Sequence, residues 1–93
     1  MPVLITAEVR GQTPEGYEAM RALLADALRQ SPGFILHTAH PTEDGWRVIE
    51  VWESKEDSDR FFTKYVAPNL PAGIHPKRAQ QALHGLITRA QVI

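Results

Sequence analysis

A glutamate and a tryptophan two positions apart are the residues of this chain best placed to do chemistry. Glu50 and Trp52 lie in the segment 46–53, whose side chains alternate as in a β-strand, so both point to the same face. The carboxylate could act as a general base or hydrogen-bond a substrate hydroxyl. The tryptophan could stack on an aromatic molecule or donate its indole N–H. We therefore expect a small-molecule site around these two residues.

Both residues also have a purely structural interpretation. Glu50 could form an ion pair that holds the sheet or a dimer together. The arginines that could take part are Arg10, Arg47 and Arg89. Trp52 could be an ordinary core or interface tryptophan, and Trp46, next to a turn, an interface or rim aromatic. The sequence alone leaves both interpretations open.

The histidines suggest acid/base chemistry rather than metal binding. His84 falls in a predicted strand and is an acid/base candidate, because an imidazole titrates near neutral pH. His37 and His40 are three positions apart in another predicted strand, so they point to opposite faces and cannot chelate one ion. We therefore predict no metal site, and a role for His37 if its face borders a ligand.

Apolar residues on the predicted helices would form the remaining wall of a ligand site. The residues expected to contact a substrate are Leu24, His37, Phe61, Phe62 and Tyr65. Tyr17 and Tyr65 each fall on the apolar stripe of a helix, so core packing is the default for both. The chain has no phosphate-binding loop, dinucleotide fingerprint or serine nucleophile elbow, and we predict no cofactor.

The hydrophobic pattern predicts six elements that would position these residues, in the order strand, helix, strand, strand, helix, strand. Thr13 and Pro14 mark the start of the first helix, and Ser54 and Pro68 the start and end of the second. The four strands are expected at 3–10, 34–40, 46–53 and 82–91, the first helix runs to about Gln30, and 69–81 is irregular enough to be a lid or an arm.

This order predicts an α+β fold, the ferredoxin-like βαββαβ sandwich, with both helices on one face of an antiparallel sheet. The third strand is apolar on both faces: Trp46, Val48 and Trp52 share one side, while Ile49 and Val51 occupy the other. A strand of this kind needs two coverings. We therefore expect a homodimer in which two sheets meet face to face.

Length and composition exclude several classes of protein. The 93 residues suffice for a single domain spanning 1–93, and 10 Lys+Arg against 11 Asp+Glu give no basic footprint for nucleic acid or anionic membrane. The absence of cysteine excludes disulfides and thiolate chemistry. No signal peptide or transmembrane segment is recognisable, so we expect a cytoplasmic protein.

The segment from Val48 to Glu56, which reads Val-Ile-Glu-Val-Trp-Glu-Ser-Lys-Glu and precedes an aromatic on the next helix, resembles a known motif. It is similar to that of the antibiotic-biosynthesis-monooxygenase-like (ABM) proteins of the dimeric α/β-barrel superfamily. The resemblance implies a dimeric α/β barrel. Phe61 stands where many small relatives carry a histidine, which argues against a haem or histidine-assisted oxygenase, and no counterpart of the Asn and Tyr of the quinone-forming members is evident.

Proteins of this superfamily include quinone-forming oxygenases without cofactor, haem-degrading enzymes, polyketide cyclases and isomerases. By resemblance we expect an enzyme that acts on an aromatic or polyketide-like molecule by cofactor-free oxygenation, driven by substrate deprotonation. A cyclase or isomerase of the same fold is one alternative. A non-catalytic homodimer that binds a ligand or another protein is the other, and its pocket would lack an ionisable group within reach of the ligand.

Overall fold

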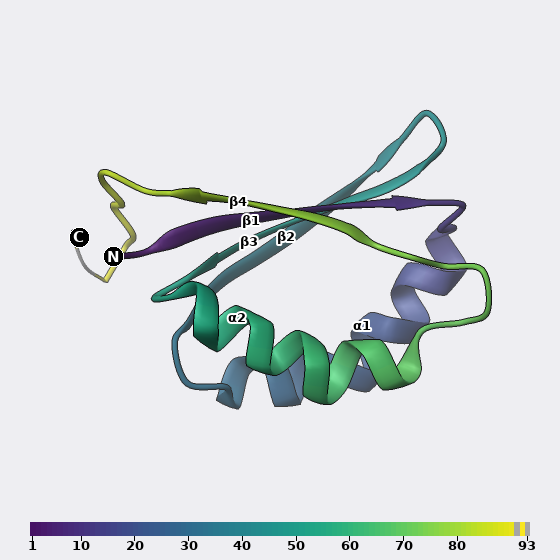
Figure 1. Ribbon diagram of the computed structural model, residues 1–93, viewed down its shortest axis with the longest axis horizontal. Helices are drawn as coiled ribbons and strands as arrows, with labels where there is room; N and C mark the ends of the chain where they lie inside the picture. The colour runs from purple at the N-terminus through teal and green to yellow at the C-terminus, as the bar shows by residue number, and fades with distance from the viewer. Residues whose placement is uncertain (91, 93) are drawn as a thin grey trace.

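The computed structural model describes residues 1–90 and 92, which form one sheet with helices on one side (Figure 1). The elements in chain order are β1 Val3–Arg10, α1 Pro14–Gln30, β2 Phe34–Thr42, β3 Gly45–Trp52, α2 Lys55–Phe61 and β4 Lys77–Ala82. After α2 the chain continues as a π-helical turn and a 3₁₀ turn, Phe62–Val66 and Ala67–Asn69.

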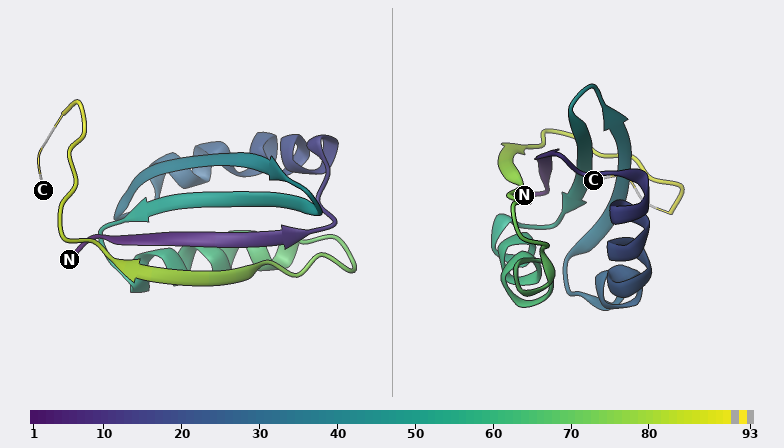
Figure 2. Two further views of the ribbon diagram at one scale, coloured as in Figure 1. Left: turned by 90° about the horizontal axis from the view of Figure 1, so that it is seen from above. Right: turned by 90° about the vertical axis from the view of Figure 1, so that its right-hand side faces the viewer.

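The sheet has the strand order β2-β3-β1-β4, and every neighbouring pair is antiparallel. Figure 2 shows the four strands side by side as one layer, with α1 and α2 together beneath it. This is the predicted α+β ferredoxin-like sandwich, which the structure confirms for the single chain. The face-to-face pairing of two such sheets stays a prediction.

Both helices begin where the sequence indicated. The side chain of Thr13 accepts a hydrogen bond from the Gly16 N–H at 3.0 Å, and that of Ser54 accepts one from the Asp57 N–H at 3.1 Å. Each bond satisfies an N–H that has no partner within the helix. Pro68 does not mark the end of the second helix: α2 ends at Phe61, and the helical turns after it continue through Pro68 to Asn69, because Pro68 falls in the first turn of the 3₁₀ segment, where a missing N–H is tolerated.

The prediction of the fourth strand was wrong. β4 spans Lys77–Ala82 rather than 82–91, and it pairs with β1 from Lys77 opposite Glu8 to Ala82 opposite Val3. Because β1 begins at Val3, it offers no partner to the described residues beyond Leu83, among which Ile87 and Val92 form an isolated bridge. Figure 2 shows this tail running past the strand ends. The last predicted strand residue, Gln91, lies outside the described residues.

The β2–β3 hairpin is also tighter than predicted, because the strands extend to Thr42 and Gly45 and include Pro41. β2 is an edge strand, where a proline without an N–H can be accommodated. The packed core lies between the sheet and the helices. Its buried residues are Val3, Ile5, Leu28, Trp52 and Phe61.

Candidate active site

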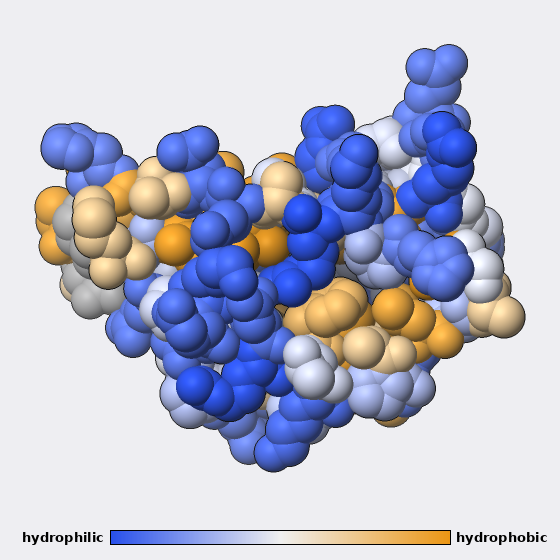
Figure 3. Space-filling model, in the orientation of Figure 1, coloured by the Kyte–Doolittle hydropathy of each residue, from blue (hydrophilic) through white to orange (hydrophobic). Residues whose placement is uncertain are grey.

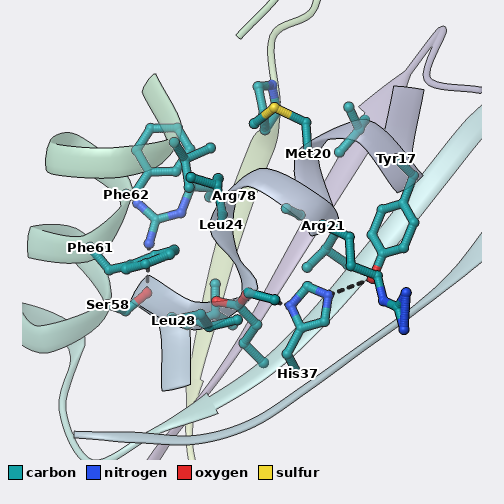
Figure 4. Close-up of a pocket in the computed structure, with 18 of the residues that line it drawn as sticks. Tyr17, Met20, Arg21, Leu24, Leu28, His37, Ser58, Phe61, Phe62 and Arg78 are labelled. Carbon is teal, nitrogen blue, oxygen red and sulfur yellow. Dashed lines mark hydrogen bonds and ion pairs between the residues drawn. The ribbon is translucent and has the colours of Figure 1, made fainter. Parts of the chain in front are cut away.

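A cavity of about 280 Å³ continues the core between the sheet and the two helices (Figure 4). Its wall is mostly apolar. Of the residues predicted to contact a substrate, Leu24, Phe61, Phe62 and His37 line it, whereas Tyr65 does not. The cavity is close in size to the ~300 Å³ at the lower end of small-molecule sites. It is therefore suited to a small, largely apolar ligand.

A chain of hydrogen bonds crosses one side of this cavity and ends in the core. The Tyr17 hydroxyl lies 2.7 Å from His37 Nε2, and His37 Nδ1 lies 2.7 Å from Glu50 Oε2. The indole N–H of Trp52 donates to the other carboxylate oxygen, Glu50 Oε1, at 2.8 Å. The side chains of His37 and Glu50 are only 24% and 15% exposed. The structure thus links a phenol, an imidazole and a carboxylate in a single row.

The fold positions each member of this row. His37 of β2 and Glu50 of β3 are paired directly in the antiparallel register, and both point to the face that the helices cover. Tyr17 reaches them from the first turns of α1, and its ring stacks on Trp46 with centroids 5.3 Å apart and planes 20° from parallel. Figure 4 shows the Tyr17 hydroxyl facing the His37 ring. The row therefore joins two strands and a helix.

The chemistry of the three groups sets the direction of the bonds. An ionised carboxylate can only accept, so with Glu50 charged His37 carries its proton on Nδ1 and donates it. The Nε2 of a neutral His37 is then an acceptor, and Tyr17 donates to it. Burial raises the pKa of Tyr17, which keeps the phenol protonated at neutral pH. This is the arrangement of a base, an orienting carboxylate and a hydroxyl known from hydrolase triads.

Glu50 does not form the ion pair with an arginine that the sequence left open. Arg47 instead donates to both carboxylate oxygens of Glu8, at 2.6 and 3.1 Å, and Arg10 lies 3.4 Å from Asp44. Arg89 lies on the exposed tail after β4. The carboxylate of Glu50 is therefore available for the polar row beside the cavity.

Trp52 lies in the core and does not line the cavity. Its side chain is fully buried, and its ring packs against Phe34 and Phe61 with centroids 5.5 and 5.7 Å away. Since its indole N–H is bonded to Glu50, it cannot stack on a ligand or donate to one in this structure. In the structure Trp52 therefore lies outside the cavity and bonds to Glu50, and its catalytic role stays a prediction.

Two further candidates are also away from the cavity. His84 is exposed on the tail, because the strand that was to carry it ends at Ala82. Tyr65 packs against Phe61 at 5.2 Å between ring centroids and supports the core from outside. His40 points away from His37, as predicted, and contacts the carbonyl oxygen of Pro41 at 2.8 Å.

Arg78 is a cavity residue that the sequence analysis missed. It lies on β4, donates to Ser58 Oγ at 2.8 Å and to Asp59 at 3.2 Å, and stacks 4.5 Å from the centre of the Phe62 ring. Bonds from Lys55 and then Arg78 hold the pKa of Asp59 below its ordinary value. Figure 4 shows Arg78 and Phe62 across the cavity from Tyr17 and His37. The misplaced fourth strand concealed this residue, because Arg78 fell in the predicted arm.

The space-filling view in Figure 3 shows how polar and apolar side chains are distributed over one face of the molecule. Polar and charged side chains cover α2, whereas apolar side chains gather beside it beneath the sheet (Figure 3).

Among residues 1–90 and 92, no group of three or more metal-binding side chains occurs. No helix in that part of the chain is long and apolar enough to span a membrane.

Several solved structures share the fold of this chain. No family model matches the chain, and no curated protein matches it. SnoaB from Streptomyces nogalater, a cofactor-independent oxygenase, has a similar structure, with a TM-score of 0.71 and 18% identity over 97% of this chain and 98% of SnoaB. A Shewanella loihica protein provisionally assigned as a monooxygenase gives 0.61 and 20% over 88% and 93%.

A protein from Shewanella oneidensis gives a TM-score of 0.52 and 18% identity, over 86% of this chain and 90% of its own. At such identities the likeness concerns the fold. The chain thus has the fold of the ABM-like proteins, the group to which the segment Val48 to Glu56 pointed, and the predicted resemblance is confirmed at that level.

Proposed function

We propose that this protein is a cofactor-independent oxygenase that deprotonates a small hydroxylated aromatic molecule and lets the resulting anion react with O₂. The observation that carries the proposal is the row formed by Tyr17, His37 and Glu50 on the wall of an otherwise apolar cavity. A base of this kind in a site poor in water favours formation of a reactive carbanion. The SnoaB-like fold supports the proposal by analogy.

The reaction needs no electron carrier, because the substrate supplies the electrons. Loss of a proton from an anthrone- or quinol-type carbon gives a carbanion that transfers an electron to O₂, and recombination forms a peroxide anion. Protonation and loss of water then leave a carbonyl group, so that CH₂ and O₂ become C=O and H₂O. The apolar residues Leu24, Phe61 and Phe62 would hold the rings and exclude water.

The polar row also weighs against a binding protein without catalysis. Such a protein was expected to lack ionisable groups within reach of its ligand, whereas Tyr17, His37 and Glu50 all border the cavity. A cyclase or isomerase would need the same proton transfer, so the oxygen requirement is the property that separates it from the proposed oxygenase.

We expect oxygen uptake that matches product formation when the purified protein is given anthrones and hydroquinones. With ¹⁸O₂, one labelled atom should enter the new carbonyl group. Turnover should survive chelators, and the protein should be colourless as purified. Oxygen consumption, mass spectrometry and absorption spectra measure these properties.

Three results would contradict the proposal. Equal turnover without oxygen would indicate a cyclase or isomerase, and tight binding of the panel without turnover would indicate a binding protein. Recovery of stoichiometric haem or flavin from the native protein would contradict cofactor independence.

We also propose that the protein is a homodimer formed through the outer face of the sheet. Leu36 and Ile49 point to that face, opposite to His37 and Glu50, and Leu36 is 42% exposed. An exposed apolar sheet face is a common site of association, and a stable dimer should bury more than ~1,000 Å².

Light scattering at micromolar concentration should therefore give about twice the chain mass, and Leu36→Asp should lower it to that of the monomer. Leu23→Asp is the matched control, because Leu23 is a more exposed leucine, at 60%, on α1. A wild-type protein that stays monomeric at these concentrations would refute the dimer. So would a Leu23 variant that dissociates as readily as the Leu36 variant.

A further inference from the structure

The three polar groups beside the cavity differ in the hydrogen-bonding capacity they have left. Both ring nitrogens of His37 are engaged, one by Tyr17 and one by Glu50. Both oxygens of Glu50 hold a partner, and one of those partners is the buried Trp52. Within the described residues the Tyr17 hydroxyl makes one hydrogen bond, and a hydroxyl oxygen can accept two more. Tyr17 is therefore the member of the row best able to receive a ligand.

We propose that Tyr17 is the catalytic residue that contacts the substrate and takes its proton, while His37 accepts the proton that Tyr17 releases. This inference deepens the proposed function and rests on it. It assigns Glu50 the role of a positioning residue, which orients His37 and stabilises its charged form. The sequence analysis predicted core packing for Tyr17 and gave Glu50 as the candidate general base.

The proposed step is balanced without an additional reactant. The O–H or C–H bond of the substrate breaks, and its proton bonds to the Tyr17 oxygen. At the same time the original O–H bond of Tyr17 breaks, and that proton bonds to His37 Nε2. The products are a substrate anion and an imidazolium ion paired with the carboxylate of Glu50. The reverse transfer later supplies the proton that the peroxide needs to leave as water.

The surroundings of Tyr17 suit this role. Stacking on Trp46 and the bond to His37 hold the ring at the cavity wall. Burial is the main cause that raises the pKa of Tyr17, and the negative charges of Glu18 and Glu50 add to it. The positive charge of Arg21, one helical turn further along α1, acts in the opposite direction and would favour negative charge on the phenol or on a bound substrate.

The same placement indicates the class of substrate. A ligand that meets Tyr17 must present an acidic O–H or C–H to it, with aromatic rings lying between Leu24 and Phe61 on the apolar wall. Across the cavity, Arg78 is held in place by Ser58 and Asp59, and it can face only a neutral or anionic part of the ligand. We therefore infer a phenol or enol with a second, oxygen-bearing end rather than a plain hydrocarbon.

Tyr17→Phe tests this assignment, with Tyr65→Phe as the matched control. We expect Tyr17→Phe to lower kcat by about 10²–10³-fold with little change in KM, because it removes a group needed for proton transfer. Tyr65→Phe should retain the wild-type rate, since Tyr65 lies outside the cavity. Full activity in the Tyr17 variant would overturn the assignment.

A substrate that is already ionised provides the decisive comparison. An anthrone assayed at a pH above its own pKa is ionised before it binds and needs no base, so the Tyr17 variant should process it within a few-fold of the wild-type rate. An equally large loss with this substrate would show that Tyr17 only supports the structure, which would overturn the proposal.

Nuclear magnetic resonance of the His37 ring tests the same assignment without turnover. We expect neutral His37 to carry its proton on Nδ1, with Nε2 unprotonated and shifted by the Tyr17→Phe change. A proton on Nε2 above neutral pH would overturn the proposal, because that nitrogen could not accept from Tyr17. A protein with the expected tautomer and no oxygen-dependent turnover would contradict the proposed function alone, which keeps the two failures distinguishable.

Discussion

Glu50→Gln should lower the turnover of an anthrone- or quinol-like substrate by about 10²–10⁴-fold. The amide can keep the bond from Trp52 through its oxygen, and its NH₂ group then faces His37 Nδ1. His37 must accept there, so its proton moves to Nε2, the atom that the Tyr17 hydroxyl needs as an acceptor. The substitution therefore reverses the direction of the hydrogen bonds in the row, while the shape of the side chain is conserved.

Steady-state kinetics and thermal melting, measured on the same preparations, check this prediction. Glu53→Gln is the matched control, because Glu53 is an exposed glutamate one residue beyond the end of β3. The melting temperature of the Glu50 variant should change little. Within the described residues Glu50 is paired with His37 and Trp52 and with no arginine, so the change leaves no arginine without its partner. A variant that keeps its rate, or one that loses rate only in proportion to folded protein, would contradict the role of Glu50.

Trp52→Ala should destabilise the protein by about 3–5 kcal/mol. The side chain of Trp52 is fully buried in the core cluster with Ile5, Leu28 and Phe61, so truncation leaves a large hole in a small core. It also removes the indole donor from a carboxylate that is 15% exposed. Trp52→Phe should cost less, about 1–3 kcal/mol, since most of the packing remains while the hydrogen bond to Glu50 is lost.

Urea denaturation followed by circular dichroism measures these losses. Trp46→Phe is the control, because the indole N–H of Trp46 is buried and has no partner among the described residues. Its replacement should cost less than that of Trp52 for the same change in size. If Trp52→Phe leaves stability unchanged, the hydrogen bond from the indole N–H to Glu50 does not stabilise the fold, and the prediction is contradicted.

Local sequence determined the helices, three of the four strands and the fold. Alternation marked β1 and β3, and Thr13 and Ser54 marked the helix starts, because these signals depend on residues close together in the chain. The same alternation placed Glu50 and Trp52 on one common face, and the structure shows that the helices cover that face. Symmetric pairing across the predicted loop 41–45 would have set His37 opposite Ile49, and only the tighter turn of the structure, with Thr42 opposite Gly45, sets it opposite Glu50.

The tertiary structure alone decided where β4 lies and which side chains meet at the cavity. A strand forms where a neighbour offers unpaired backbone groups, so β4 ends at Ala82 opposite the start of β1, and β1 offers no partner to the described residues beyond it. Tyr17 joins His37 only because α1 packs across β2 and β3. Such contacts depend on the crossing of distant elements, and no short-range pattern in the chain encodes that crossing.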